Sequence, residues 1–212
     1  PIESNIFDFL NKYDLDLQKN LVLDSKCGNV QVQQSVGLFR MNRAVQYPFF
    51  PVVDTFNSKD SVAGIIVNKL EQILPLFPSE IKIDTVRSEN VLNVSTLFTS
   101  SNNSGLMSSN FMLSPDPQQN PFLQLLGQTG KVLCALSSLK GGGELMLISD
   151  SKFLSDEGGM SIPDNMVFLM NAVDYLADDE DLISLRSREV TSRPLDILQL
   201  SDEEELTISQ DD

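Results

Sequence analysis

Histidine is absent from this chain of 212 residues. Its absence excludes Ser-His-Asp and Cys-His nucleophile systems and every zinc site that depends on imidazole, and with them most hydrolase mechanisms. Cysteine is scarce, because Cys27 and Cys134 stand alone, far apart and without metal or redox spacing. Cys134 lies in the apolar run 132–136, which indicates a small buried thiol, although a disulfide to Cys27 stays open.

Basic residues are also few, with 15 Lys and Arg against 30 Asp and Glu and a net charge of -15. This balance argues against nucleic acid and against an anionic membrane surface as partners. No run of eighteen apolar residues occurs and no signal peptide is visible. With 41% hydrophobic residues the chain is globular. Because it begins with Pro1, we expect a soluble piece of a longer protein whose flanks could carry anchors.

Strand-like and helix-like segments alternate along most of the chain, which predicts an α/β domain. We expect strands at 21–24, 30–33, 81–83, 91–99, 132–136 and 145–148, and helices at 6–13, 122–127 and 163–177. The segment 58–76 fits either a helix or a strand. The aromatic segment 47–53 is held extended by two prolines, and we interpret it as a core-covering loop rather than a ligand platform.

Glycines 141–143 connect one expected strand to the next. Phosphate-binding loops run from a strand into a helix, so this run predicts a hairpin instead. Asp150 and Asp156, with Glu157 nearby, could hold a hard cation, but the spacing of a calcium loop is missing. A helix cap or a loop hydrogen bond explains Asp150 equally well, and we expect no metal and no cofactor.

The stretch 145–188 carries the most information, because it contains a strand, an acidic turn and an amphipathic helix. Pro163 suits a first helical position. Helical spacing predicts that one face packs in the core and that the other is a wet surface or a small polar site. The expected core face holds Met166, Leu169, Met170, Val173, Leu176 and Ala177, and the expected polar face holds Asn171, Asp174, Tyr175 and Asp178.

The run Asp178–Asp181 follows this helix, where carboxylates oppose the helix dipole. Such a placement suggests solvent exposure or a basic partner, and Arg186, Arg188 and Arg193 are near enough in sequence to supply one. A catalytic pair of acids is conceivable, but nothing in the sequence marks which two would face each other.

Four segments resemble the GldG-type family, the auxiliary proteins of uncharacterised ABC transport systems linked to bacterial gliding motility, whose domain is related to one of intraflagellar-transport proteins. These segments are 14–24 (DLDLQKNLVLD), 47–51 (YPFFP), 148–156 (ISDSKFLSD) and 171–176 (NAVDYL) with 179–183 (DEDLI) and Arg186. Tyr175 stands where tryptophan is usual, and Lys152 replaces an acid. The similarity covers roughly residues 5–195.

The resemblance implies an α/β fold with a mixed or mostly parallel sheet flanked by helices, similar to the class I glutamine-amidotransferase-like sandwich, with its N-terminal part missing. It also implies a membrane-tethered subunit on the periplasmic or extracellular side, beside an ABC permease and its ATPase. The nucleophile elbow of that enzyme fold needs cysteine and histidine, so any such chemistry would be lost here.

The sequence therefore predicts a non-catalytic binding or scaffolding domain over residues 1–195, followed by an acidic tail at 196–212 that leads to an anchor outside this chain. If a partner or ligand contact exists, we expect it at Asp150, Ser151, Asn171 and Asp174. One alternative is a substrate-binding module for a glycan or a peptide. Another is a hydrolase that uses paired carboxylates.

Overall fold

The computed structural model describes residues 5–36, 39–56, 61–84, 86–116, 122–156, 158–179, 181 and 183. The expected boundary at 195, the acidic tail 196–212, and Glu157 and Arg186 lie outside these ranges. The helices are α1 (Ile6–Asn11), α2 (Ser61–Ile66), α3 (Phe122–Leu125), the 3-10 helix η1 (Gly159–Ser161) and α4 (Pro163–Leu176). The strands are β1 (Asp16–Leu17), β2 (Leu21–Asp24), β3 (Cys27–Val36), β4 (Phe39–Pro51), β5 (Ile81–Lys82), β6 (Val91–Thr99), β7 (Ser104–Met107), β8 (Val132–Leu139) and β9 (Glu144–Ile148).

All pairs between these strands are antiparallel. One sheet follows the order β1-β5-β8-β6, with β9 also paired to β8, while β2 pairs with β7 and β3 with β4. The predicted mixed or mostly parallel α/β sandwich, similar to the class I glutamine-amidotransferase-like fold, is therefore wrong. The chain is mostly antiparallel β structure.

The central strand β8 shows why its apolar run alone does not distinguish a parallel sheet from an antiparallel one. Five consecutive residues, Leu133 to Ser137, are buried, and strands buried on both faces read as continuous apolar runs, a pattern typical of parallel sheets. Here the double burial has another cause. Leu133 and Leu136 pack in one core cluster and Ala135 in another, because helices cover both faces of an antiparallel sheet.

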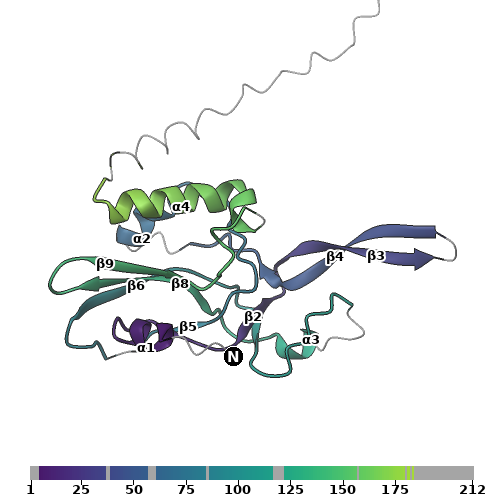
Figure 1. Cartoon of the computed structure of the whole chain (residues 1–212), viewed down its shortest axis with the longest axis horizontal. Helices are drawn as coiled ribbons and strands as arrows, with labels where there is room; N and C mark the ends of the chain where they lie inside the picture. The colour runs from purple at the N-terminus through teal and green to yellow at the C-terminus, as the bar shows by residue number, and fades with distance from the viewer. Residues whose placement is uncertain are drawn as a thin grey trace, which may run out of the picture.

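Figure 1 shows α2 and α4 on one side of the large sheet and α1 on the other. The core between α4 and the sheet contains Phe98 and Phe168, whose ring centroids lie 5.4 Å apart at 76°. The core on the α1 side contains Leu10, Leu15 and Ile81. These two clusters fix the large sheet between its helices.

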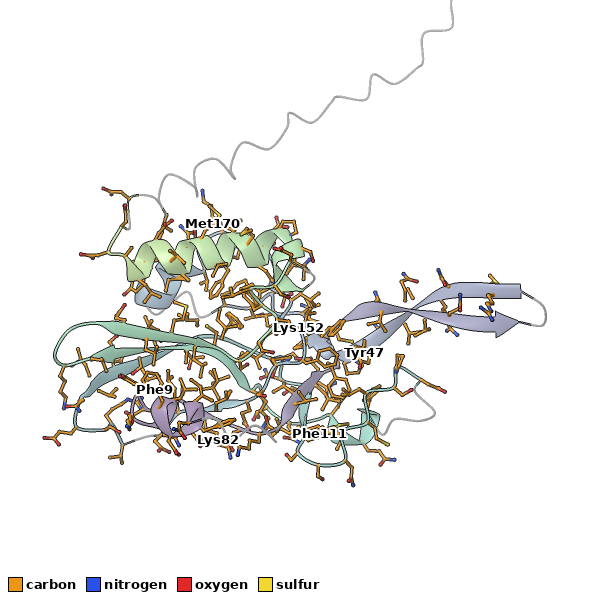
Figure 2. The ribbon with its side chains drawn as sticks, in the orientation of Figure 1. Phe9, Tyr47, Lys82, Phe111, Lys152 and Met170 are labelled. Carbon is orange, nitrogen blue, oxygen red and sulfur yellow. The ribbon has the colours of Figure 1, made fainter. Side chains whose placement is uncertain are left out.

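The buried face of α4 differs from the expected one. Asn165, Phe168, Asn171 and Ala172 are the buried residues of this helix. Within the expected core face, Met170, Val173 and Leu176 are 43%, 56% and 44% exposed, and Met170 lies on the outer side of α4 (Figure 2). The helix has two partly apolar faces, and the face that carries the large Phe168 ring was the one buried.

Strands β3 and β4 extend together away from the rest of the molecule (Figure 1). Their register runs from Asn29–Gln46 to Val36–Phe39, and we call residues 29–36 and 39–46 the arm. At its base, the segment expected as a core-covering loop is the end of β4. It contributes buried Tyr47 and Phe49 to a third core cluster, so the expected core role is confirmed although the segment is a strand.

Several local predictions are confirmed. The expected strands 21–24 and 91–99 coincide with β2 and β6. The segment 58–76, which the sequence left open between a helix and a strand, contains the short helix α2. Glycines 141–143 lie in the β8–β9 hairpin, where Gly142 and Gly143 have φ of 86° and 90°, a region that glycine adopts without strain. The sequence left a disulfide between Cys27 and Cys134 open, and both cysteines are free in the structure. No helix in the described ranges is long and apolar enough to cross a bilayer.

Candidate functional site

The turn after β9 holds Asp150 as a buried hydrogen-bond acceptor. Its Oδ2 accepts the backbone N–H of Leu76 at 2.8 Å, and its Oδ1 accepts that of Lys152 at 2.7 Å. Burial raises the pKa of the Asp150 carboxyl above its ordinary value, while these two hydrogen bonds act in the opposite direction. The loop hydrogen bond considered from sequence is therefore present, and Asp150 joins the β9 turn to the segment before Pro78.

Two side chains in the first turn of α4 hold the same segment. Oδ2 of Asp164 accepts the backbone N–H groups of Glu71 and Gln72 at 3.0 and 2.9 Å. Asn165 pairs with the backbone of Leu74 in both directions. Its Oδ1 accepts the Leu74 N–H at 2.9 Å, and its Nδ2 donates to the Leu74 carbonyl at 3.0 Å. The side-chain amide thus pairs with Leu74 as a neighbouring strand would.

We call Asp150, Asp164 and Asn165 the loop clamp, because together they bind backbone groups of residues 71–76. Ile73, between the clamped residues, pairs with Val53 on the other side at 2.7 and 2.8 Å. The clamp satisfies backbone groups that a strand partner would otherwise have to satisfy. Sequence reasoning missed Asp164 and Asn165. An acid in the first turn of a helix was a visible signal, but its partners lie 93 and 92 residues away.

The four residues expected at a contact site differ in burial and in their known hydrogen-bond partners. Asn171 is 3% exposed, and its Nδ2 donates to the carbonyl of Ile66 at the end of α2, 3.0 Å away. It is therefore not on a wet surface. Asp150 binds Leu76 instead. Ser151 is exposed and Asp174 is half-buried. The contact role of these four residues stays a prediction.

A separate polar groove of about 300 Å³ lies beside the base of the arm. It is lined by Lys26, residues 52–55 and residues 99–102. Lys26 pairs with Asp54, and this hydrogen bond holds the pKa of the Asp54 carboxyl below its ordinary value. The groove offers an ammonium, a carboxylate, several hydroxyls and an amide, which suit a small polar ligand.

Asp24 connects two of the segments that line this groove. Its side chain is fully buried and accepts three hydrogen bonds, from the Lys26 N–H at 2.9 Å and from the N–H and hydroxyl of Ser101 at 2.6 Å each. Charged acceptors with several donors are strongly held when buried. Asp24 therefore joins the turn that begins β3 to the turn after β6, on both sides of the groove.

The acidic side chains and the two thiols in the described part of the chain bear on whether it holds a metal site or a reactive cysteine. Within the described ranges, no three side chains among Cys, Asp and Glu are placed to hold a metal ion. Burial raises the pKa of the Cys134 thiol well above its ordinary value, and burial also raises that of Cys27. Both changes favour the protonated thiols and slow their reaction as nucleophiles.

Comparison with known proteins identifies one family. A family model described as an ABC-type uncharacterized transport system, of the auxiliary kind, matches residues 1–172. No curated protein and no solved structure matches the chain. The matched range contains the arm, the polar groove, the loop clamp and most of α4.

Proposed function

This chain belongs to the family of auxiliary proteins of uncharacterised ABC-type transport systems, and from that premise we propose that it is a non-catalytic binding and scaffolding domain of such a system. The match over residues 1–172 carries this proposal. It agrees with the family resemblance seen in the sequence. The transport energy would come from a separate ATPase, so the domain has to position partners and needs no chemistry of its own.

The finer assignment is to the gliding-motility, GldG-type branch of the family. In this proposal residues 1–195 form one domain on the periplasmic or extracellular face of the cytoplasmic membrane. The acidic segment 196–212 leads toward a membrane anchor, and the partners are the ABC permease and other transport subunits. The four matching segments, above all 148–156 and 171–176, support this assignment.

The proposed contact with a transport subunit uses Ser151 and Asp174 directly. Ser151 is exposed and Asp174 is half-buried, so a partner can reach both. The other two candidates act indirectly. Asp150 holds the β9 turn that carries Ser151, and Asn171 holds α4 against α2.

Co-purification from membranes of the native cell tests this function. The full-length protein carrying an affinity tag should retain the permease and the ATPase encoded with it. Ser151→Arg should weaken this retention, whereas Ser108→Arg, the same change at another exposed serine, should not. If neither the wild-type protein nor the Ser108→Arg control retains the permease and the ATPase, the result contradicts the proposed function. Equal retention by both variants would count only against the contact residues.

Location is tested by labelling intact cells with a membrane-impermeant maleimide. Lys140→Cys places a thiol in the exposed β8–β9 hairpin, while burial raises the pKa values of Cys27 and Cys134 and slows their reaction. Extracytoplasmic placement predicts labelling of the variant in intact cells. Labelling that requires cell lysis would place the domain in the cytoplasm.

A second candidate function is recognition of a small polar ligand, such as a glycan or a peptide, and the polar groove favours it. Lys26 and Asp54 would meet opposite partial charges of a ligand, and the hydroxyls of residues 99–101 would supply hydrogen bonds. A thermal-shift screen with oligosaccharides and short peptides tests this idea. A stabilising compound should lose its effect in Lys26→Met, and a screen with no such compound would remove this candidate.

A further inference from the structure

The arm is amphipathic. Side chains two residues apart in a strand share a face, and the register pairs Val30 with Val45 and Val32 with Arg43. These four residues and Met41 therefore share one face, and because the register also pairs Met41 with Gln34, this face is apolar apart from Arg43 and Gln34. Gln31, Gln33, Asn42, Ala44 and Arg40 lie on the opposite face, which is polar.

Among the described residues, no helix or strand covers the apolar face along the distal part of the arm, since the arm extends away from the other labelled elements (Figure 1). Met41 is 59% exposed, and Val32 is only half-buried. A two-stranded ribbon with both faces in water is only marginally stable. This combination indicates that another surface covers the apolar face of the arm.

A complementary surface exists on the outer side of α4. Met170, Val173 and Leu176 follow one another at three-residue spacing and are all exposed, so they form a continuous stripe along the helix. We call it the outer stripe. Exposed Asp179 and Asp181 follow its C-terminal end. The outer stripe is thus apolar along its length and acidic at one end.

Charge and length both match the arm to the outer stripe. Residues 29–46 contain two arginines and no acid, in a chain with 15 basic and 30 acidic residues. Eight paired positions in the arm span about 25 Å at strand geometry, whereas the outer stripe from Met170 to Leu176 spans about 10 Å of α4, so the arm is long enough to cover the whole stripe. Arg43 is the cation on the apolar face, so it would meet the acids beyond Leu176.

We propose that the chain forms a twofold-symmetric dimer in which the arm of each copy lies along the outer stripe of the other. The contact occurs twice, because in a twofold dimer each arm-to-helix contact has its symmetric counterpart. It buries the apolar face of the ribbon and the outer stripe together. It also places Arg43 of each copy near Asp179 and Asp181 of the other. This dimer is independent of the proposed transport role.

Sedimentation velocity over a concentration series tests the dimer, with matched variants on the two faces of the arm. The wild-type chain should show a reversible monomer–dimer equilibrium that weakens as salt is added. Met41→Asp should raise the dimer Kd by about tenfold or more, since it puts a charge into the apolar contact. Asn42→Asp adds the same charge to the polar face next to it and should change the Kd little.

A mixing experiment identifies the two surfaces as partners. Arg43→Glu and Asp179→Arg should each weaken the homodimer, because each brings like charges together. An equimolar mixture of the two variants should recover dimer, since every arm-to-helix contact in that heterodimer again joins opposite charges. Circular dichroism confirms that each variant is folded. A wild-type chain that is monomeric at all concentrations, equal effects of Met41→Asp and Asn42→Asp, or a mixture that stays monomeric would each overturn the proposal.

Discussion

Asn165→Asp is the sharpest test of the loop clamp, because it replaces only the side-chain NH2 group by an oxygen at a buried site. Asn165 is 1% exposed and pairs with both backbone groups of Leu74. In the variant, one carboxylate oxygen still accepts the Leu74 N–H. The other oxygen replaces the amide donor and faces the Leu74 carbonyl oxygen, 3.0 Å from the replaced nitrogen. Two acceptors then face each other without a proton between them.

The magnitude follows from this geometry. Loss of one hydrogen bond costs about 1 kcal/mol, and the unpaired buried acceptors add about 1–3 kcal/mol. We therefore expect the free energy of unfolding to fall by about 3 kcal/mol at pH 8. For a chain of this size, each kcal/mol lowers Tm by about 2–4 °C, so the expected drop is about 6–12 °C.

Acid should restore part of this loss. Burial and the facing carbonyl raise the pKa of the introduced carboxyl, and the protonated form can donate to the Leu74 oxygen. The stability contributed by the protonated form is fully present below the ordinary pKa, about 3.9. It is lost as the pH rises through the raised folded value. The deficit relative to wild type should therefore shrink as the pH falls from 8 toward 4.5.

Thermal unfolding followed by circular dichroism at several pH values measures the effect. Asn42→Asp makes the same chemical change at an exposed arm position and should shift the free energy by less than about 0.5 kcal/mol. An Asn165→Asp protein as stable as wild type at pH 8 would refute the pairing with Leu74. A deficit that does not change with pH would refute the proposed electrostatic cause.

Three further changes probe other parts of the structure. Asp150→Asn should lose stability relative to wild type most clearly at acid pH. Because the folded pKa of Asp150 is raised, the stability from the protonated carboxyl is present below the ordinary pKa and is lost as the pH rises through the folded value. Urea titrations measure this, and a difference in the free energy of unfolding between wild type and variant that is the same at every pH would contradict it. Gly105→Ala places a methyl group 2.0 Å from the Leu125 carbonyl oxygen, so Tm should fall by several degrees, and an unchanged Tm would be the contrary result. Cys134 is fully buried with a raised pKa, so thiol reagents should modify it only after denaturant is added, and rapid modification of the native chain would argue against its burial.

The local elements were largely predictable because their signals are local. Alternation and turn residues located β2, β6 and the β8–β9 hairpin, and Pro163 at a first helical position located α4. The family of ABC-type transport auxiliary proteins was also visible in the sequence, and the match over residues 1–172 confirms it at that level. These features depend on neighbouring residues, so no knowledge of distant contacts was needed.

The buried face of α4 and the loop clamp were not predictable in this way. Met170 and Val173 resemble core residues in sequence, whereas Asn165 and Asn171 resemble surface residues. The asparagines are buried because their amides find backbone partners at Leu74 and Ile66. Those partners lie far away in the chain, and hydrophobicity alone assigns such residues to water.

The sequence by itself determined the missing imidazole chemistry, the acidic charge, the positions of most strands and the family. Tertiary structure decided the direction of strand pairing, since an apolar run buried on both faces reads alike in parallel and antiparallel sheets. It also decided which face of α4 is exposed and placed the distal part of the arm away from the other described helices and strands (Figure 1). Each of these outcomes depends on which segments, far apart in the sequence, pack together. Side-chain periodicity within one segment does not specify its distant partner.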